Sequence, residues 1–129
     1  MTDNKNVKKQ FTVEQDYDFQ GDSLLFNITQ KYRYQKSVQI KDNIIIDFDE
    51  NDVPVALELL NASKLLHVNK SSLTYPMGID MFIEVGQEMI KLQAKFLISI
   101  HQKQTPMSLN EQTSNDINLR VTESHFATA

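Results

Sequence analysis

The strongest constraint on the fold is the alternation of apolar and polar residues through much of the chain. Between positions 90 and 100 every second residue is apolar, and the residues between them are polar except Leu97. Period two indicates a β-strand with one buried face, because successive side chains point to opposite sides of a sheet. The same repeat recurs over residues 24–29, 38–41, 44–49, 53–60 and 79–85. The sequence therefore predicts a mainly β protein of the α+β class.

Turn residues and propensities refine this prediction. Gly86-Gln87-Glu88 separates the two most regular strands, so an antiparallel hairpin is expected there. Residues 55–66 have high helix propensity and suit either a helix or a strand followed by a short helix. We expect a strand to about Leu60 and a helical turn over 62–66. The polar residues 102–116 predict a long loop or a weakly ordered edge hairpin.

A chain of 129 residues is long enough for one domain, or for two small lobes that fold together. Residues 1–10 lack periodicity and are expected to form a flexible arm. Residues 11–66 predict an antiparallel β-meander with a short helix. Residues 67–76 lose the apolar repeat and predict a linker, and residues 77–129 predict a second antiparallel β-hairpin unit packed on the first.

Composition excludes several classes of site. The chain has no cysteine, which excludes disulfides, thiolate zinc sites, iron–sulfur clusters and cysteine nucleophiles. Its 13 Lys and Arg against 17 Asp and Glu give a net charge of −4, which disfavours non-specific binding of nucleic acid. The basic residues of 31–36 are typical of an edge strand. No apolar run has the length of a signal peptide or a bilayer span, so a cytoplasmic protein without a membrane partner is expected.

One segment resembles a known family. Its matching motifs are Tyr17-Asp18, Gly21-Asp22-Ser23-Leu24, Ile46-Asp47-Phe48-Asp49-Glu50 and Leu57-Glu58-Leu59-Leu60-Asn61-Ala62-Ser63. On these motifs, residues 17–66 resemble the domain-of-unknown-function family 2283, small uncharacterised proteins of bacteria and archaea. The resemblance implies a small β-meander with a short terminal helix and assigns no activity, cofactor or substrate.

The chain departs from the family pattern around its acidic hairpin. The family usually has glycine at the position of Asp52, and a small residue such as glycine is frequent at the position of Ala56. Pro54 replaces a residue that is commonly apolar. The resemblance therefore implies a hairpin here without fixing its turn type.

An acidic motif in the same hairpin suggests a divalent cation site. Asp47, Asp49, Asn51 and Glu58 have the spacing D-x-D-x-N followed by Glu at the twelfth position. Calcium loops of the EF-hand type use this spacing, because alternate oxygens converge on the cation and the distal Glu closes the site. Asp52, however, stands where such loops need glycine, and the flanking residues predict strands. A solvated acidic hairpin is the simpler interpretation, and calcium is the alternative.

Catalytic motifs give no positive indication. His67, His101 and His125 are far apart, and no G-x-S-x-G nucleophile elbow is present. Three glycines in total leave no glycine-rich phosphate loop. Catalytic residues and a cofactor are therefore not expected, and the histidines are interpreted as surface residues.

Apolar residues on the outer strand faces give the functional hypothesis. Two small amphipathic sheets must bury their apolar faces against each other or against a second chain. Four large apolar residues fall on the faces that the pattern makes outer: Phe82, Leu97, Leu25 and Leu60. Gathered on one surface, such residues would mark an interface. We expect a non-enzymatic interaction or structural module whose partner is a second copy, as a homodimer, or another protein.

Overall fold

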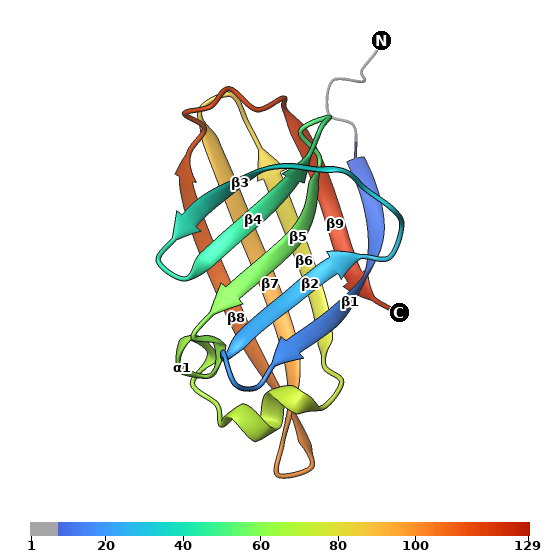
Figure 1. Ribbon diagram of the computed structural model, residues 1–129, viewed down its shortest axis with the longest axis vertical. Helices are drawn as coiled ribbons and strands as arrows, with labels where there is room; N and C mark the ends of the chain where they lie inside the picture. Colours follow the sequence, from blue (N-terminus) through green and yellow to red (C-terminus); the bar gives the residue numbers. More distant parts are fainter. Residues whose placement is uncertain (1–7) are drawn as a thin grey trace.

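The structure, a computed structural model, describes residues 8–129, and these form nine strands in one sheet with two short helices (Figure 1). The elements are β1 Lys8–Asp18, β2 Ser23–Ile28, β3 Tyr34–Lys41, β4 Ile44–Asp49, β5 Pro54–Leu60, α1 Ala62–Leu66, the 3₁₀ helix η1 Lys70–Thr74, β6 Gly78–Val85, β7 Met89–Ile100, β8 Lys103–Ser114 and β9 Thr122–Thr128. The strand order is β3-β4-β5-β2-β1-β9-β6-β7-β8.

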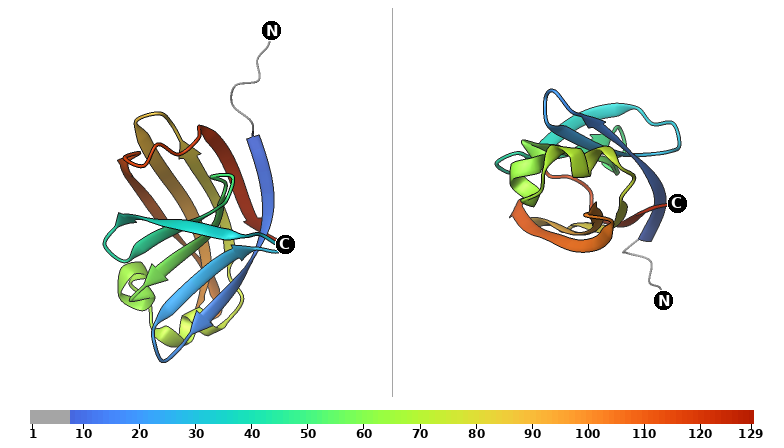
Figure 2. Two further views of the ribbon diagram at one scale, coloured as in Figure 1. Left: turned by 45° about the horizontal axis from the view of Figure 1, so that its top comes forward. Right: turned by 90° about the horizontal axis from the view of Figure 1, so that it is seen from below.

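The sheet folds over on itself into two layers whose strands cross (Figures 1 and 2). We call β3, β4, β5, β2 and β1 the front layer, and β9, β6, β7 and β8 the back layer, as Figure 1 presents them. Strand β1 connects the layers, because its first half pairs with β9 in parallel and its second half pairs with β2 antiparallel. The Phe11 and Phe126 rings stack across the parallel junction with centroids 5.4 Å apart. The two halves of the chain therefore share one sheet.

The apolar faces of both layers meet in a single core. Phe26 of β2 and Phe96 of β7 are fully buried, and their ring centroids lie 5.8 Å apart across the layers. Helices α1 and η1 cover one end of the core, with Leu66 and Leu73 buried against it (Figure 2). Burial of each such side chain contributes about 1.5–3 kcal/mol. Because the core lies between the layers, the outward-facing residues of the front layer form one surface of the molecule. Those of the back layer form the opposite surface.

Several sequence predictions are confirmed. The chain is mostly β with a short α-helix, and β6 and β7 form the expected hairpin. Residues 55–66, for which the sequence allowed either a helix or a strand and a short helix, form a strand that ends at Leu60 and then a helix over Ala62–Leu66. Asn61, with φ 51°, takes the left-handed conformation that separates them, which asparagine tolerates better than most residues. Within residues 8–129, no helix has the length and apolarity needed to cross a membrane.

The pairing order differs from a simple meander. Strand β2 pairs with β5 and β1, whereas β3 pairs with β4 at the edge of the sheet. The five residues between β2 and β3 explain the difference, since adjacent strands of a hairpin are usually joined by a tighter turn. The long-loop alternative for 102–116 is wrong and the edge hairpin is right, because β8 pairs with β7 along twelve residues. The inward residues of β8 are mostly only half-buried, so several of them are polar and the period-two signal is weak.

The predicted segment boundaries correspond to the following elements. Residues 8–10 of the predicted arm are part of β1 and pair with β9, and residues 1–7 lie outside the described residues. The predicted linker 67–76 contains η1, whose Leu73 is fully buried. Residues 77–129 contribute the back layer together with its junction to β1.

Candidate functional site

The outer surface of the back layer is made by the alternate residues of four adjacent strands. In β6 and β7, every second side chain is buried in the core, so the residues between them point outward. We call the resulting surface the outer back face. Its central members are Gly78, Asp80, Phe82 and Glu84 of β6 and Lys91, Gln93, Lys95 and Leu97 of β7. The flanking strands add His125 and Glu123 from β9, and Pro106, Ser108, Asn110 and Gln112 from β8.

Two large apolar side chains are exposed on this face. Phe82 is 43% exposed and Leu97 is 47% exposed. The Phe82 ring stacks on the imidazole of His125 with centroids 4.6 Å apart. The Nε2 atom of His125 lies 2.6 Å from Oδ1 of Asp80. These contacts hold the Phe82 ring in place, so the apolar surface is presented in a fixed orientation.

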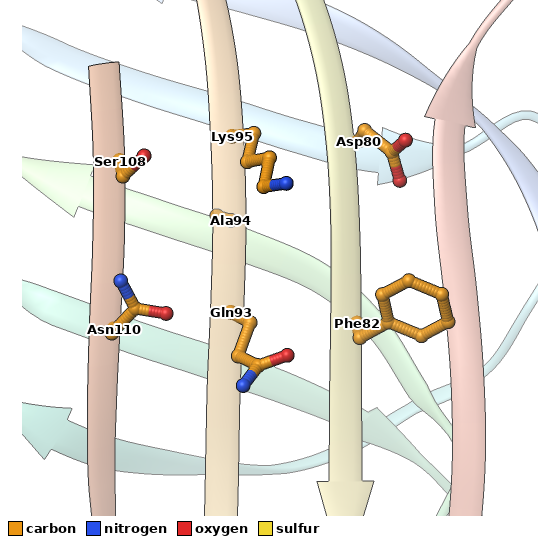
Figure 3. Close-up of a pocket in the computed structure, with 7 residues that line it drawn as sticks. All are labelled: Asp80, Phe82, Gln93, Ala94, Lys95, Ser108 and Asn110. Carbon is orange, nitrogen blue, oxygen red and sulfur yellow. The ribbon is translucent and has the colours of Figure 1, made fainter.

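A shallow groove crosses the centre of the face (Figure 3). Its lining residues are Asp80, Phe82, Gln93, Ala94, Lys95, Ser108 and Asn110. Figure 3 shows the Lys95 side chain extending toward β6 and the Asp80 carboxylate. Charged, amide and aromatic side chains of the outer back face therefore line the groove.

Charge is distributed on this face strand by strand. Asp80 and Glu84 of β6 are acidic, and their cross-strand neighbours Lys95 and Lys91 of β7 are basic. Among residues 8–129, neither lysine lies within 4.0 Å of a carboxylate oxygen, nor does the Glu84 carboxylate lie that close to a basic group. Unpaired side chains of both signs thus stand side by side on an exposed surface.

The four apolar residues predicted to share one interface lie on two surfaces. Phe82 and Leu97 are on the outer back face, where the Asp80–Lys95 pair separates their positions along the strands. Leu25 and Leu60 are half-buried on the outer side of the front layer, on β2 and β5. The core lies between the two layers, so these two pairs face in opposite directions.

The acidic hairpin brings together only part of the predicted calcium motif. Asp47 on β4 is buried, and its Oδ1 accepts a hydrogen bond of 2.6 Å from Oγ of Ser37 on β3. That hydroxyl also contacts the Tyr34 hydroxyl at 2.8 Å. Glu58 on β5 lies diagonally opposite Asp47, because Ala56 is the register partner of Asp47. Asp47 and Glu58 are therefore neighbours on the outer side of the front layer.

The carboxyl group of Glu58 holds its proton more tightly than an ordinary glutamate does. A hydrogen bond with Asp47, burial and repulsion by the Asp47 charge raise the pKa of Glu58 to about 7. Burial and the nearby Asp47 and Glu58 charges also raise the pKa of Tyr32, in the β2–β3 connection. Glu58 is thus protonated below neutrality and donates to Asp47.

Asp49 and Asn51 lie apart from this pair and serve the turn. Oδ1 of Asp49 accepts hydrogen bonds from the backbone N–H groups of Asn51 and Val53, at 2.8 and 2.9 Å. Asn51 itself is exposed at the tip of the hairpin. Across residues 8–129, no three His, Cys, Asp or Glu side chains converge as a metal ion would require.

Comparison with known proteins places the chain in a family. The profile of the family described as "Protein of unknown function (DUF2283)" matches residues 15–63. A protein of Methanosarcina mazei named "Putative hypoxanthine phosphoribosyltransferase" is 32% identical over 114 residues, which cover 88% of this chain and 91% of that protein. The chain belongs to the DUF2283 family. An uncharacterized protein of Methanocaldococcus jannaschii is 44% identical over 61 residues, or 47% of this chain and 51% of that protein. No solved structure matches the chain.

The DUF2283 segment contains a buried polar network that explains its motifs. Oδ1 of Asp22 accepts hydrogen bonds from the Tyr17 hydroxyl at 2.7 Å and from the Ser63 backbone N–H at 3.0 Å. Its Oδ2 accepts from Oγ of Ser63 at 2.7 Å. Burial raises the pKa of Asp22, but the hydrogen bonds from Tyr17 and Ser63 outweigh it and hold that pKa below its ordinary value. The network ties the β1–β2 turn to the start of α1 and has a structural role.

Asp52, where the resemblance led us to expect glycine, has a backbone conformation typical of glycine. Its φ is 63°, in the left-handed region that favours glycine. Its side chain accepts a hydrogen bond from the Arg120 backbone N–H at 3.1 Å and pairs with Lys36 at 3.1 Å. The aspartate therefore adds contacts that glycine lacks, one of them to the second half of the chain.

Sequence patterns did not reveal the pairing of His125 with Asp80 or of Ser37 with Asp47. His125 and Asp80 are 45 positions apart in the sequence and become neighbours only because β6 pairs with β9. Local periodicity contains no information on which distant strands become neighbours. Once β6 and β9 are known to pair, the register alone places both residues on the outer back face.

Proposed function

We propose that this DUF2283 chain is a non-enzymatic β-rich interaction module that associates with a second copy through its outer back face. The main evidence for this proposal is that Phe82 and Leu97 are exposed on one sheet surface. They lie on β6, whose outward charged residues are acidic, and on β7, whose outward charged residues are basic. Large apolar side chains rimmed by polar groups are typical of protein–protein contacts. On the opposite sheet surface Leu25 and Leu60 are half-buried, and the exposed aromatic side chain is Tyr34 at the edge strand β3.

The polar lining of the groove favours a protein over a small molecule as the occupant. Its volume is about 350 Å³, and it is lined mainly by charged and polar side chains. Small-molecule pockets are concave and mostly apolar, with few polar groups. A mostly polar sheet surface with two exposed apolar side chains suits the surface of another protein better.

The activity in the name of the Methanosarcina mazei relative is not part of this proposal. Phosphate groups are commonly held by glycine-rich loops at helix N-termini. In this chain Gly21 and Gly86 lie in connections between strands, and Gly78 begins β6. None of the three precedes a described helix directly.

Solution mass with matched substitutions tests the proposal. Light scattering over a concentration series is expected to give a dimer mass for the wild-type chain. Phe82→Asp and Leu97→Asp are expected to shift it toward the monomer, because each replaces a large apolar side chain by a charge that the contact between the copies would bury. Leu25→Asp and Leu60→Asp, on the outer side of the front layer, are the matched controls and are expected to retain the dimer mass if they fold. A monomer at every concentration of wild type would refute the proposal.

Calcium binding by the acidic hairpin is the second candidate function. The observation in its favour is the juxtaposition of Asp47 and Glu58, two oxygen-bearing groups that a hard cation prefers. Asp49, however, uses its Oδ1 in the turn. Calcium titration followed by amide NMR tests this candidate, which requires shifts at Asp47, Asp49 and Asn51. Unchanged spectra at millimolar calcium would exclude it.

A further inference from the structure

The central strands of the outer back face form four cross-strand pairs with complementary members. Lys95 stands opposite Asp80, Lys91 opposite Glu84, Gln93 opposite Phe82 and Leu97 opposite Gly78. Each pair thus joins an acid with a base, an amide with an aromatic ring, or a large side chain with a glycine. The line between β6 and β7 is also the midline of the four-stranded back layer.

With a two-fold axis along that midline, the complementary residues of these cross-strand pairs also face each other between two copies. In a symmetric dimer the same patch is used twice, so residue i of one copy contacts residue j of the other and the reverse. Rotation by half a turn about an axis parallel to the strands lays β6 of one copy over β7 of its partner. Every residue then faces the partner's copy of its own cross-strand neighbour.

We propose that two copies of this chain pair face to face through the outer back face, with the two-fold axis running between β6 and β7 parallel to the strands. This inference rests on the proposed self-association and adds its partner surface and register. Asp80 faces Lys95 of the second copy, and Glu84 faces Lys91. Acidic β6 therefore lies on basic β7 in both halves of the interface.

The flanking strands are compatible with the same axis. Strand β9 of one copy lies over β8 of the other, because these strands are equally distant from the midline. His125 then faces Asn110, since both occupy the row of Phe82 and Gln93. Glu123 faces Gln112, since both occupy the row of Glu84 and Lys91. These contacts bring hydrogen-bonding groups together and oppose no like charges.

The alternative symmetric arrangement opposes like charges. An axis across the strands, centred on the row of Phe82, lays β6 on β6 and β7 on β7. It places Asp80 against Glu84 of the second copy and Lys91 against Lys95. Like charges facing one another in an interface are strongly unfavourable. The strand-wise charge distribution thus selects the axis parallel to the strands.

Gly78 provides space for the exposed leucine. An added Cβ at Gly78 would meet only Leu97 of its own chain, at 3.6 Å, so its outer side is otherwise open. The axis between β6 and β7 places Leu97 of the second copy over this open position. Sheets that pack face to face keep their strand directions within about 30° of each other, which the arrangement satisfies.

Charge reversal tests the register with three variants. The first carries Asp80→Lys and Glu84→Lys, which makes β6 basic beside basic β7. The second carries Lys91→Glu and Lys95→Glu, which makes both strands acidic. The control carries Glu14→Lys and Asp16→Lys at exposed positions of β1 in the front layer, and its change in net charge equals that of the first variant. Sedimentation analysis of each variant, and of an equimolar mixture of the first two, reports the masses.

The proposal predicts that each charge-reversed variant is a monomer, its self-association at least about tenfold weaker than that of wild type. The control remains a dimer. The mixture of the two variants forms a dimer, because each basic strand then meets an acidic one, and this rescue also shows that both variants are folded. If wild type is a dimer and either variant alone is also a dimer, the register is overturned and the proposed self-association stands. A mixture that stays monomeric would also overturn the register, and a monomeric wild type would overturn both.

Discussion

The backbone N–H of Arg120 donates a hydrogen bond of 3.1 Å to Oδ2 of Asp52, a residue 68 positions earlier in the chain. The bond joins the β4–β5 turn of the DUF2283 segment to the connection that leads into β9. Asp52 accepts it in a left-handed backbone conformation with φ 63°. Asp52 thus forms a contact between the two halves of the chain.

Substitution of Asp52 separates its backbone strain from its contacts. Asp52→Ala removes the contacts with Arg120 and Lys36 and keeps the strained φ, so we expect a loss of about 1–2 kcal/mol of unfolding free energy. Asp52→Gly loses the same contacts but relieves the strain, which is about 1 kcal/mol for a non-glycine residue. Urea denaturation should rank the alanine variant below the glycine variant. Equal stabilities would show that the left-handed conformation has no energetic cost here.

The Asp22 network predicts stability that depends on its charge. Ser63→Ala removes the hydroxyl bond to Oδ2 and is expected to cost about 1 kcal/mol, and Asp22→Asn about 1–3 kcal/mol. Because the pKa of Asp22 is lowered in the folded chain, its contribution is present above the ordinary pKa of 3.8 and is lost as pH falls through the folded value. Urea midpoints at neutral and acidic pH measure both effects. Ser23→Ala, beside the network, is the control, and an equal loss in that variant would argue against the network.

Glu58 predicts the opposite pH dependence. Its pKa is raised from 4.5 to about 7, so its stabilising protonated form is fully present below 4.5 and is lost as pH rises through 7. Glu58→Gln keeps a donor for Asp47 at every pH. We expect this variant to be more stable than wild type at pH 8 and to lose the fall in stability between pH 4.5 and 7. Carboxyl NMR titration measures the group directly, and a midpoint near 4.5 would contradict the raised pKa of Glu58.

Salt provides a further test of the charged interface. The ion pairs proposed between β6 and β7 of two copies lie near the surface, where added ions screen them. The dimer dissociation constant is therefore expected to rise with sodium chloride concentration. In the Asp80→Asn, Glu84→Gln variant the salt dependence should be smaller than in wild type. A dimer that tightens steadily with salt would indicate an interface dominated by apolar contacts.

Local patterns predicted most strands because one face of each is buried. The alternation in β7 and the turn residues around Gly86 predicted the hairpin, whereas its register, and with it the pairing of Asp80 with Lys95, came from the structure. The edge strand β8 was ambiguous because its inward residues are only half-buried and several are polar. The parallel pairing of β1 with β9 joins the two ends of the chain, which periodicity does not encode. Periodicity also does not encode which strands share a layer, so the sequence could not show that Leu25 and Leu60 lie on a different surface from Phe82 and Leu97.

Intermolecular contacts of His125 test the central claim most directly. A dimer mixed from isotope-labelled and unlabelled chains allows NMR detection of nuclear Overhauser effects between copies alone. With the axis along the strands, the His125 ring of one copy contacts the Asn110 side chain of the other. Detection of that contact is the predicted result. Contacts between His125 of both copies, or between residues of the front layers, would contradict the account.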